Sequence, residues 1–424
     1  MPDFELPQLA PRDRCTGCGA CANGCPKNAI HMLPDREGFC YPTVTDACVQ
    51  CGHCTHICPV LKQREKRSAP AVFAAWNPDR ETRMVSTAGG VFALLADYVL
   101  ESGGVVFGAA VDEELHVRHV AVTSPSELSS LLGSKPIQSE IGNSYDRVRR
   151  YLERGRRVLF SGTPCQVDGL YRYLGEYPEN LLTVDVLCRG VSSPGVWAHL
   201  VRSMAYVKRK RPVAVSFYSK LSGVRDRRFR VRFEDGSHFD APYDKSELGR
   251  GHRRGLFLRT ACHTCPYATT DRPGDLTLGQ FRGLPKDFYP HEQKQGISLL
   301  LVNTAKGAQT VDVLPLKKEL RTLAEAMVAN PALSTPIPAP AERTAFFNAF
   351  AQQPFQQVRN RFLAPLAYQT KNRGKGLWKL LVKKPKEDRK PLWKNADAHL
   401  LCPLLRVLYR AAALPRHRAG GLLV

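Results

Sequence analysis

The sequence lacks the long apolar run that a membrane-spanning helix requires, because no stretch reaches about 18 consecutive apolar residues. Its first ten residues, MPDFELPQLA, contain no basic region followed by an apolar segment, so we expect no secretion signal. Disulfide bonds belong to oxidising compartments, and the 14 cysteines of a chain that is not exported are expected to stay reduced. These absences predict a cytoplasmic protein.

Acidic residues are scarce: 39 Asp and Glu stand against 61 Lys and Arg, which gives a formal net charge of +22. Residues 356–424 hold 16 basic and three acidic residues, and therefore +13 of this excess. Tryptophan and leucine are interleaved with these basic residues, which suits peripheral contact with an anionic membrane at its inner face. A solvated or partly disordered tail is the open alternative. No helix-turn-helix pattern indicates nucleic acid as a partner.

Eight of the cysteines form two copies of one spacing, C-x2-C-x2-C-x3-C-P, within residues 15–59. This is the run of bacterial ferredoxins, in which three cysteines hold one [4Fe-4S] cluster and the fourth is a ligand of the other cluster. A zinc site needs only four ligands and would leave half of these cysteines idle. We therefore expect two clusters, one held by Cys15, Cys18, Cys21 and Cys58 and the other by Cys48, Cys51, Cys54 and Cys25. Cys40 is surplus to both sets and is expected to be a packing residue.

The rest of the chain reads as two further parts. After a charged stretch that ends at Pro70, buried strands alternate with helices, which is typical of an α/β sheet with its functional residues at the strand ends. We expect strands over 71–76, 105–111 and 181–188, and a capping box of Ser124 and Glu127 is expected to begin a short helix that runs to Leu132.

From Arg211 the pattern changes to alternating strands with a hairpin turn at Asp235-Gly236, which predicts an antiparallel insertion. The arginine-rich run 225–232 alternates with apolar residues, so we expect it to form a solvated strand face; a nucleic-acid surface is the alternative. We expect a mixed α+β and α/β chain with a ferredoxin-like domain over 1–62, an α/β domain over 71–335 and a helical, basic extension over 336–424.

Four more cysteines lie far apart in the sequence. Cys165 and Cys188 each follow or end a predicted core strand, and Cys262 and Cys265 form a C-x2-C that precedes a proline. Four thiols that converge at the carboxyl edge of one sheet would hold a third [4Fe-4S] cluster. The spacing alone leaves open that the first two are ordinary buried cysteines and that the C-x2-C is a zinc knuckle or a dithiol.

Six motifs follow one another over about residues 71–310. They are Thr87-Ala-Gly-Gly90, Gly133-Ser-Lys135 with Gln138-Ser139, Ser161-Gly-Thr-Pro-Cys-Gln166, Val186-Leu-Cys-Arg-Gly190 with Ser193-Pro194, the C-x2-C-P of 262–266, and Gly296-Ile-Ser298. In this order, and with the ferredoxin module, they resemble the coenzyme F420 hydrogenase/dehydrogenase beta-subunit family. The resemblance implies a flavin-dependent iron-sulfur oxidoreductase whose third [4Fe-4S] cluster is bound beside FAD by Cys165, Cys188, Cys262 and Cys265.

Thr87, Gly89 and Gly90 lie at a predicted helix start, where free backbone amides favour a pyrophosphate, and Gly162 and Thr163 precede Cys165, where their amides could stabilise a flavin anion. Together with residues of the motifs Gly133-Ser-Lys135 and Gln138-Ser139, which carry the resemblance, these are the residues expected to hold FAD. They are Thr87, Gly89, Gly90, Ser134, Lys135, Ser139, Gly162 and Thr163. We expect Lys135 to neutralise a phosphate or the reduced flavin. The backbone amides of Gly162 and Thr163 are expected to face the isoalloxazine ring.

Four positions depart from the family's pattern, and we expect them at the walls of the substrate pocket. Gln280 stands where the family has a carboxylate, Arg282 and Pro136 where it has aromatic residues, and Arg189 where it has a histidine.

The predicted function is that of an oxidoreductase which passes electrons through [4Fe-4S] clusters to FAD and on to a two-electron acceptor. This acceptor would be a deazaflavin such as coenzyme F420 or another small molecule. The alternative is an electron-transfer subunit without a substrate site, docked to a partner enzyme. No catalytic residue and no direction of electron flow follow from the sequence.

Overall fold

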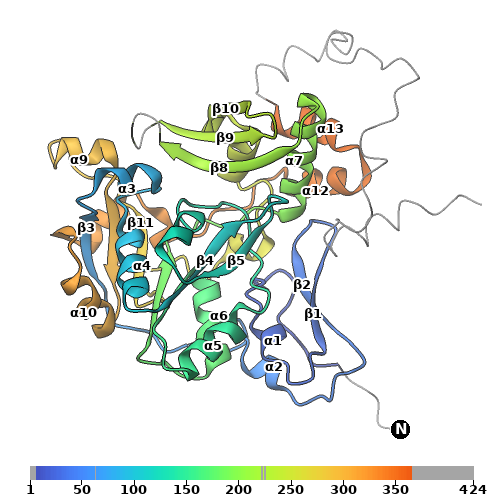
Figure 1. Ribbon diagram of the computed structural model, residues 1–424. Helices are drawn as coiled ribbons and strands as arrows, with labels where there is room; N and C mark the ends of the chain where they lie inside the picture. Colours follow the sequence, from blue (N-terminus) through green and yellow to red (C-terminus); the bar gives the residue numbers. More distant parts are fainter. Residues whose placement is uncertain (1–5, 63, 221–222, 224–225, 365–424) are drawn as a thin grey trace, which may run out of the picture. The chain divides into compact units, whose positions relative to one another are not determined.

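A mixed sheet of eight strands forms the centre of the structure, a computed structural model that describes residues 6–62, 64–220, 223 and 226–364 (Figure 1). The strand order is β13-β3-β12-β11-β7-β6-β4-β5. The strands are β3 Ala71–Trp76, β4 Val105–Val111, β5 Val117–Val122, β6 Val158–Gly162, β7 Leu181–Val186, β11 Leu276–Gln280, β12 Ser298–Val302 and β13 Lys317–Arg321. Neighbours β4, β6, β7 and β11 are parallel, so their carboxyl ends meet along one edge of the sheet. Ligands bind at such an edge.

Helices cover both faces of these parallel strands because the strands are apolar on both sides. On one face, α4 (Val91–Glu101) packs against a cluster that contains Val106 and Leu159. On the other face, α5 (Ser144–Glu153) and α6 (Pro164–Leu174) pack against Val105, Val158 and Phe160. The predicted α/β architecture is therefore confirmed.

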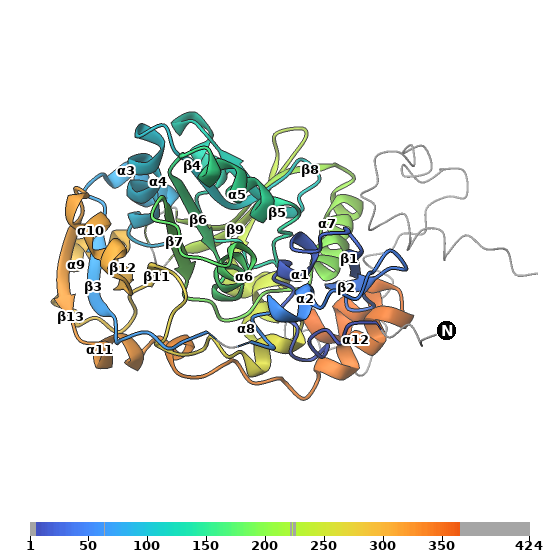
Figure 2. The ribbon, with the colours of Figure 1, turned by 90° about the horizontal axis from the view of Figure 1, so that it is seen from below.

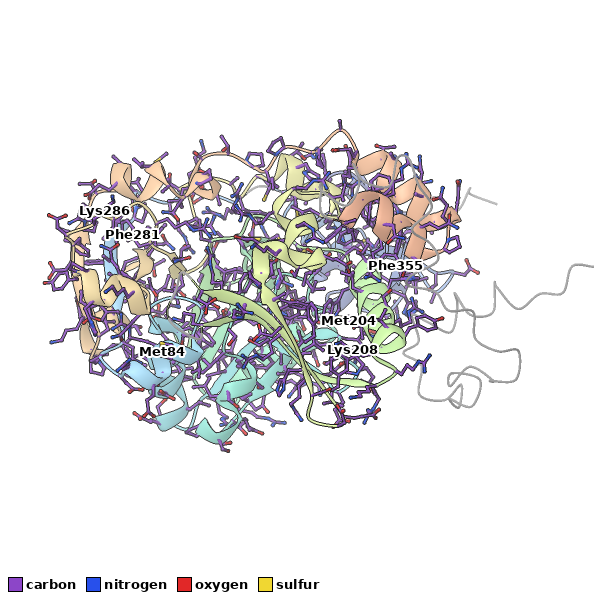
Figure 3. All side chains as sticks on the ribbon, turned by 90° about the horizontal axis from the view of Figure 1, so that it is seen from above. Met84, Met204, Lys208, Phe281, Lys286 and Phe355 are labelled. Carbon is purple, nitrogen blue, oxygen red and sulfur yellow. The ribbon has the colours of Figure 1, made fainter. Side chains whose placement is uncertain are left out.

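The predicted antiparallel insertion is a separate three-stranded sheet in the order β10-β9-β8. Its strands are β8 Pro212–Lys220, β9 Arg227–Phe233 and β10 His238–Pro242. Its apolar face packs against α7 (Pro194–Lys208) and α12 (Arg343–Gln352) in one cluster, which includes Trp197, Phe229 and Phe346. Met204 of α7 and Phe355 of α13 (Phe355–Val358) both pack against this cluster, on the side of the insertion (Figure 3).

The start of the predicted C-terminal extension therefore belongs to the same core as the insertion, and residues up to Ala364 form one compact unit. The rest of that extension, with its expected helices, its basic surface and Cys402, lies outside the described residues. In the part of the chain that is described, no helix is long and apolar enough to cross a membrane.

The N-terminal part is small and built on a hairpin, β1 (Ile30–Pro34) with β2 (Cys40–Val44), and on two short helices, α1 (Ala20–Asn23) and α2 (His53–His56). Both views place α1 beside α6 (Figures 1 and 2). The two helices approach closely because position 169 of α6 has no side chain: a Cβ atom on Gly169 would lie 3.0 Å from the Cβ atom of Cys18. The cysteine loops therefore face the carboxyl edge of the main sheet.

The remaining helices connect these parts. They are α3 Arg80–Val85, η1 Pro125–Ser130, η2 Tyr243–Lys245, α8 Glu247–Arg253, η3 Thr260–Thr264, α9 Pro290–Gln295, α10 Ala305–Val313, α11 Leu323–Val328, η4 Pro331–Leu333 and η5 Arg359–Leu363.

Candidate iron-sulfur and cofactor site

The thiols predicted to hold the first cluster lie together in the N-terminal part. Burial, and then the neighbouring thiols of Cys15 and Cys58, raise the pKa of the Cys21 thiol to about 12. Cys18 is buried beside Cys21 and Cys15, and its pKa is raised for the same reasons. A low-dielectric site with four converging thiols suits a cluster, which binds cysteines as thiolates and brings its own positive iron ions.

The second predicted set lines a small cavity. Cys25 of the first run and Cys48, Cys51 and Cys54 of the second run all lie in its wall. Backbone amides point at two of these sulfurs: Ala29 N lies 3.2 Å from Cys25 Sγ, and Gln50 N lies 3.4 Å from Cys48 Sγ. Such N–H···S contacts stabilise thiolate charge. The geometry fits the exchange of fourth ligands that the spacing predicts.

The third set consists of the cysteines at 165, 188, 262 and 265, and the fold brings all four together. Burial raises the pKa of the Cys188 thiol well above its usual range, and the nearby thiols of Cys262, Cys165 and Cys265 raise it further. Gly190 N lies 3.3 Å from Cys188 Sγ, and Thr163 Oγ1 lies 3.1 Å from Cys165 Sγ. Neither a zinc knuckle made of the C-x2-C alone nor two unrelated buried cysteines would need this convergence.

The first and third sets are neighbours. The thiol of Cys165, in the first turn of α6, lies close enough to Cys18 to contribute to the raised pKa of that residue. The hydroxyl of Tyr145 lies 2.8 Å from the backbone oxygen of Cys18 and 2.7 Å from that of Gln166, so it joins the N-terminal loop to α6. Direct contacts therefore join the ferredoxin loops to the helix that carries Cys165.

A pocket opens at the carboxyl ends of β6, β7 and β11, with about 1810 Å³ of empty space that includes its opening to solvent. Cys188 forms part of its wall, which places the third cysteine set at the pocket itself. Seven of the eight residues predicted to hold FAD line it, namely Thr87, Gly90, Ser134, Lys135, Ser139, Gly162 and Thr163. The eighth, Gly89, lies behind the wall, where its amide donates a hydrogen bond of 2.9 Å to Ser298 Oγ.

Hydrogen bonds join the motifs that surround this pocket. Ser134 N donates to Thr87 Oγ1 at 2.7 Å, and Gln166 Nε2 donates to Ser139 Oγ at 3.0 Å. Gly90 precedes α4 in the left-handed conformation, with φ of 79°, and supplies no side-chain cap. The first amides of α4 therefore remain available to an anionic group.

One predicted contact differs in the structure. The amide of Thr163 donates to Gln166 Oε1 at 2.9 Å, because Thr163 and Gln166 form a capping box at the start of α6. This amide is thus occupied within the protein. A flavin contact of Thr163 would use another of its atoms.

Lys135 lies in the pocket wall without a carboxylate partner among the described residues. Its Nζ donates to the backbone oxygens of Ser130 and Leu132, at 3.0 and 2.9 Å. Burial lowers the pKa of Lys135 to about 7. An ammonium group has three donors, so one remains for a ligand.

His119 is a pocket residue that sequence reasoning missed. Its Nε2 lies 3.0 Å from the backbone oxygen of Ser161, which can only accept, so Nε2 carries the proton. Nδ1 is then a buried acceptor, and no donor in the described residues reaches it. Burial lowers the pKa of His119 to about 4, so the ring is neutral at pH 7. An orphaned acceptor in a pocket wall fits a ligand that carries an N–H or O–H group, such as a flavin.

The outer pocket wall contains all four positions that depart from the family's pattern, Pro136, Arg189, Gln280 and Arg282. It also contains Tyr218, Arg227 and His252, which sequence reasoning did not assign to the site. The only signal for Arg227 is its place in an arginine-rich run, which also suits a solvated strand.

Two family models match the chain. Residues 155–326 match the model of the C-terminal part of the coenzyme F420 hydrogenase/dehydrogenase beta subunit, and residues 14–61 match the model of a 4Fe-4S dicluster domain. The second match confirms the prediction of two N-terminal [4Fe-4S] clusters.

Among solved structures, the chain is similar to one from the F420-reducing [NiFe] hydrogenase complex of Methanosarcina barkeri, studied by xenon derivatization. The identity is 17%, the match covers 60% of this chain and 82% of the other, and the TM-score is 0.40. A comparison with curated proteins gave no match.

Proposed function

Because the chain belongs to the coenzyme F420 hydrogenase/dehydrogenase beta-subunit family and carries a 4Fe-4S dicluster domain, we propose that it is an iron-sulfur flavoenzyme. It would exchange single electrons with a redox partner through its clusters and transfer electron pairs between FAD and a small molecule. A deazaflavin such as coenzyme F420 is one candidate for that molecule.

One observation carries this proposal: the cysteine sets and the pocket form an unbroken series. The loop of the second set is open to solvent, with Cys51 exposed and Val49 56% exposed. The first cysteine set comes next in this series. Cys165 of the third set is a neighbour of Cys18 in the first set and of Cys188 in its own set. Cys188 in turn lines the pocket. A redox partner would meet the second cluster, and the third cluster would meet the flavin.

FAD supplies the junction between single-electron transfer and hydride transfer. The residues of the pocket fit it. The free amides of α4 and the ammonium group of Lys135 would bind its diphosphate, since both attract negative charge. His119 Nδ1 would accept a hydrogen bond from the cofactor. The apolar side chains of Leu131 and Leu278 in the pocket wall exclude water from the ring.

The alternative is a subunit that transfers electrons to a partner enzyme and has no substrate site. A pocket of this size beside the third cysteine set favours the enzyme, because electron transfer between clusters alone needs no such space. The two functions also predict different activities for the isolated chain, because only the enzyme would reduce a small molecule without its partner.

The experiment is anaerobic purification of the full chain, followed by an assay of bound flavin and of the reduction of soluble acceptors. The proposal expects about one FAD per chain and transfer of electrons from reduced clusters to a small molecule. Bound clusters without flavin, under mild release conditions, would favour the electron-transfer subunit.

A further inference from the structure

The charged side chains of the pocket wall are all positive. They are Lys135, Arg189, Arg227 and Arg282, and none of the described residues that line the pocket is Asp or Glu. The two histidines in the wall add no charge at pH 7, since burial lowers the pKa of His119 and of His252 to about 4. The pocket therefore attracts negatively charged molecules.

The three arginines come from three different elements and meet at one place. Arg189 follows β7, Arg227 begins β9 and Arg282 follows β11. Arg282 and Arg189 are exposed residues in the pocket wall, and partial burial of the Arg282 guanidinium, followed by the nearby charges of Arg227 and Arg189, lowers the pKa of Arg282. Tyr218 lines the same pocket; burial raises the pKa of its hydroxyl, and the nearby charges of Arg227 and Arg282 oppose that rise.

None of these three guanidinium groups has an ion pair or a side-chain hydrogen bond among the residues that the structure describes. Two other arginines of β9, by contrast, have a carboxylate partner. Arg228 Nε lies 2.5 Å from Asp240 Oδ1, and Arg230 Nη2 lies 2.9 Å from Asp240 Oδ2. Like charges held together without a counter-ion cost free energy, and such an arrangement is typical of a binding site.

The arginines are separate from Lys135. Lys135 follows η1, and its ammonium group is held by the backbone oxygens of Ser130 and Leu132, whereas the arginines belong to β9 and to the segments after β7 and β11. The pocket thus contains two cationic sites, and the lysine lies with the residues that suit FAD. The guanidinium groups of the three arginines are available to a separate anionic group.

We propose that Arg189, Arg227 and Arg282 form an anion site that holds a phosphate or carboxylate group of the flavin's substrate. This inference rests on the proposed function and restricts the substrate to an anionic small molecule. Two of the three arginines, Arg189 and Arg282, are departures from the family's pattern, and the fold brings these departures together. A guanidinium pair can bind such a group through several parallel hydrogen bonds.

Binding of inorganic pyrophosphate to the full, anaerobically purified chain tests the site, with isothermal titration calorimetry on wild type, Arg227→Gln and Arg282→Gln. Loss of one charge-assisted hydrogen bond corresponds to about a tenfold increase in Kd. We expect that increase in both variants, and an unchanged FAD content. Arg232→Gln is the matched control, because Arg232 is an exposed arginine of β9 outside the pocket. Its Kd should equal that of wild type.

Three results would overturn the inference: no pyrophosphate binding by wild type, equal Kd values in wild type and both pocket variants, or loss of FAD from these variants. The last result would assign the arginines to the diphosphate of FAD. If wild type itself contains no FAD, the proposed function fails. The difference in Kd between wild type and the variants still tests the arginines in that case.

Discussion

Arg259 Nε donates a hydrogen bond of 2.7 Å to the backbone oxygen of Cys15, across the boundary between the main sheet and the N-terminal loops. The arginine is fully buried, and its Nη1 also donates to Gln138 Oε1 at 3.0 Å and to Cys40 O at 3.1 Å. Its Nη2 lies 3.7 Å from Cys15 Sγ. Gly17 makes room for it, because a Cβ atom there would lie 2.7 Å from Arg259 Nη1.

Arg259 differs from the other fully buried arginines. Arg272 pairs with Asp185, with 2.5 Å between Nη2 and Oδ1, and Arg83 pairs with Glu292. No carboxylate in the described residues pairs with Arg259. A buried guanidinium needs negative charge nearby. Cluster-bound thiolates of the first set would supply it on one side, and those of Cys165 and Cys262 would supply it on the other. Burial raises the pKa of both Cys165 and Cys262, and the nearby charge of Arg259 opposes that rise.

Removal of this charge should therefore make the first cluster harder to reduce. In Arg259→Gln we expect a lower midpoint potential, because the reduced cluster is the more negative form. A tenfold change in the one-electron equilibrium corresponds to about 59 mV, and we expect a fall of about this size. A redox titration followed by electron paramagnetic resonance measures it. Arg156→Gln, which removes an arginine bonded to Gly103 instead, should leave the potential unchanged. Equal potentials in Arg259→Gln and wild type would contradict the role of Arg259.

Flavin affinity should depend on pH through Lys135. In the flavin-free chain the pKa of Lys135 is about 7, so the ammonium form that attracts a diphosphate is lost as the pH rises above 7. We expect the Kd for FAD to rise above pH 7, by up to about tenfold per pH unit. Fluorescence titrations of flavin-free protein between about pH 6 and 9 measure this dependence. Lys135→Met should bind more weakly at pH 6 and show a flat profile. A wild-type profile as flat as that of the variant would exclude this role of Lys135.

Phe346 should be essential to the stability of the fold, although the sequence assigned it to the C-terminal extension. Its side chain has 0% exposure in the cluster shared by the insertion and α12. Phe346→Ala is expected to lower the free energy of unfolding by about 3–5 kcal/mol, because it leaves a cavity. Tyr206→Ala, at an aromatic residue that is 75% exposed on α7, should change it by about 0.5 kcal/mol or less. Chemical denaturation compares the two. A similar, small effect of both substitutions would show that this segment is not part of the core.

The sequence predicted the strands that are buried on both faces. Ala71–Trp76 and Val105–Val111 are continuous apolar runs between turn residues, and the structure has strands with these bounds. The capping box of Ser124 and Glu127 is also present, but the helix that it starts is a short 3-10 helix, Pro125–Ser130. The strand expected over 181–188 ends at Val186, which leaves Cys188 free to turn toward the other cysteines.

The sequence could not place the residues that act across elements. The arginine-rich run was interpreted as a solvated strand face, and this is right for Arg228 and Arg230, which pair with Asp240. It does not hold for Arg227, which lines the pocket. His119 and Arg259 are recognised as site residues from tertiary contacts alone. In the described part of the chain, His119 Nδ1 has no hydrogen-bond donor, and Arg259 has no carboxylate partner. No local pattern in a sequence carries such information.

The third cysteine set connects the ferredoxin clusters to the pocket, so the proposed path of the electrons depends on it. The iron content of anaerobically purified protein, measured in wild type and in Cys165→Ala, tests it directly. Alanine offers no ligand atom, so we expect about twelve irons per chain in wild type and about eight in the variant. Cys40→Ala, which changes a cysteine outside the three sets, should keep about twelve. About eight irons in wild type, or an equal iron content in wild type and Cys165→Ala, would show that these four cysteines hold no third cluster.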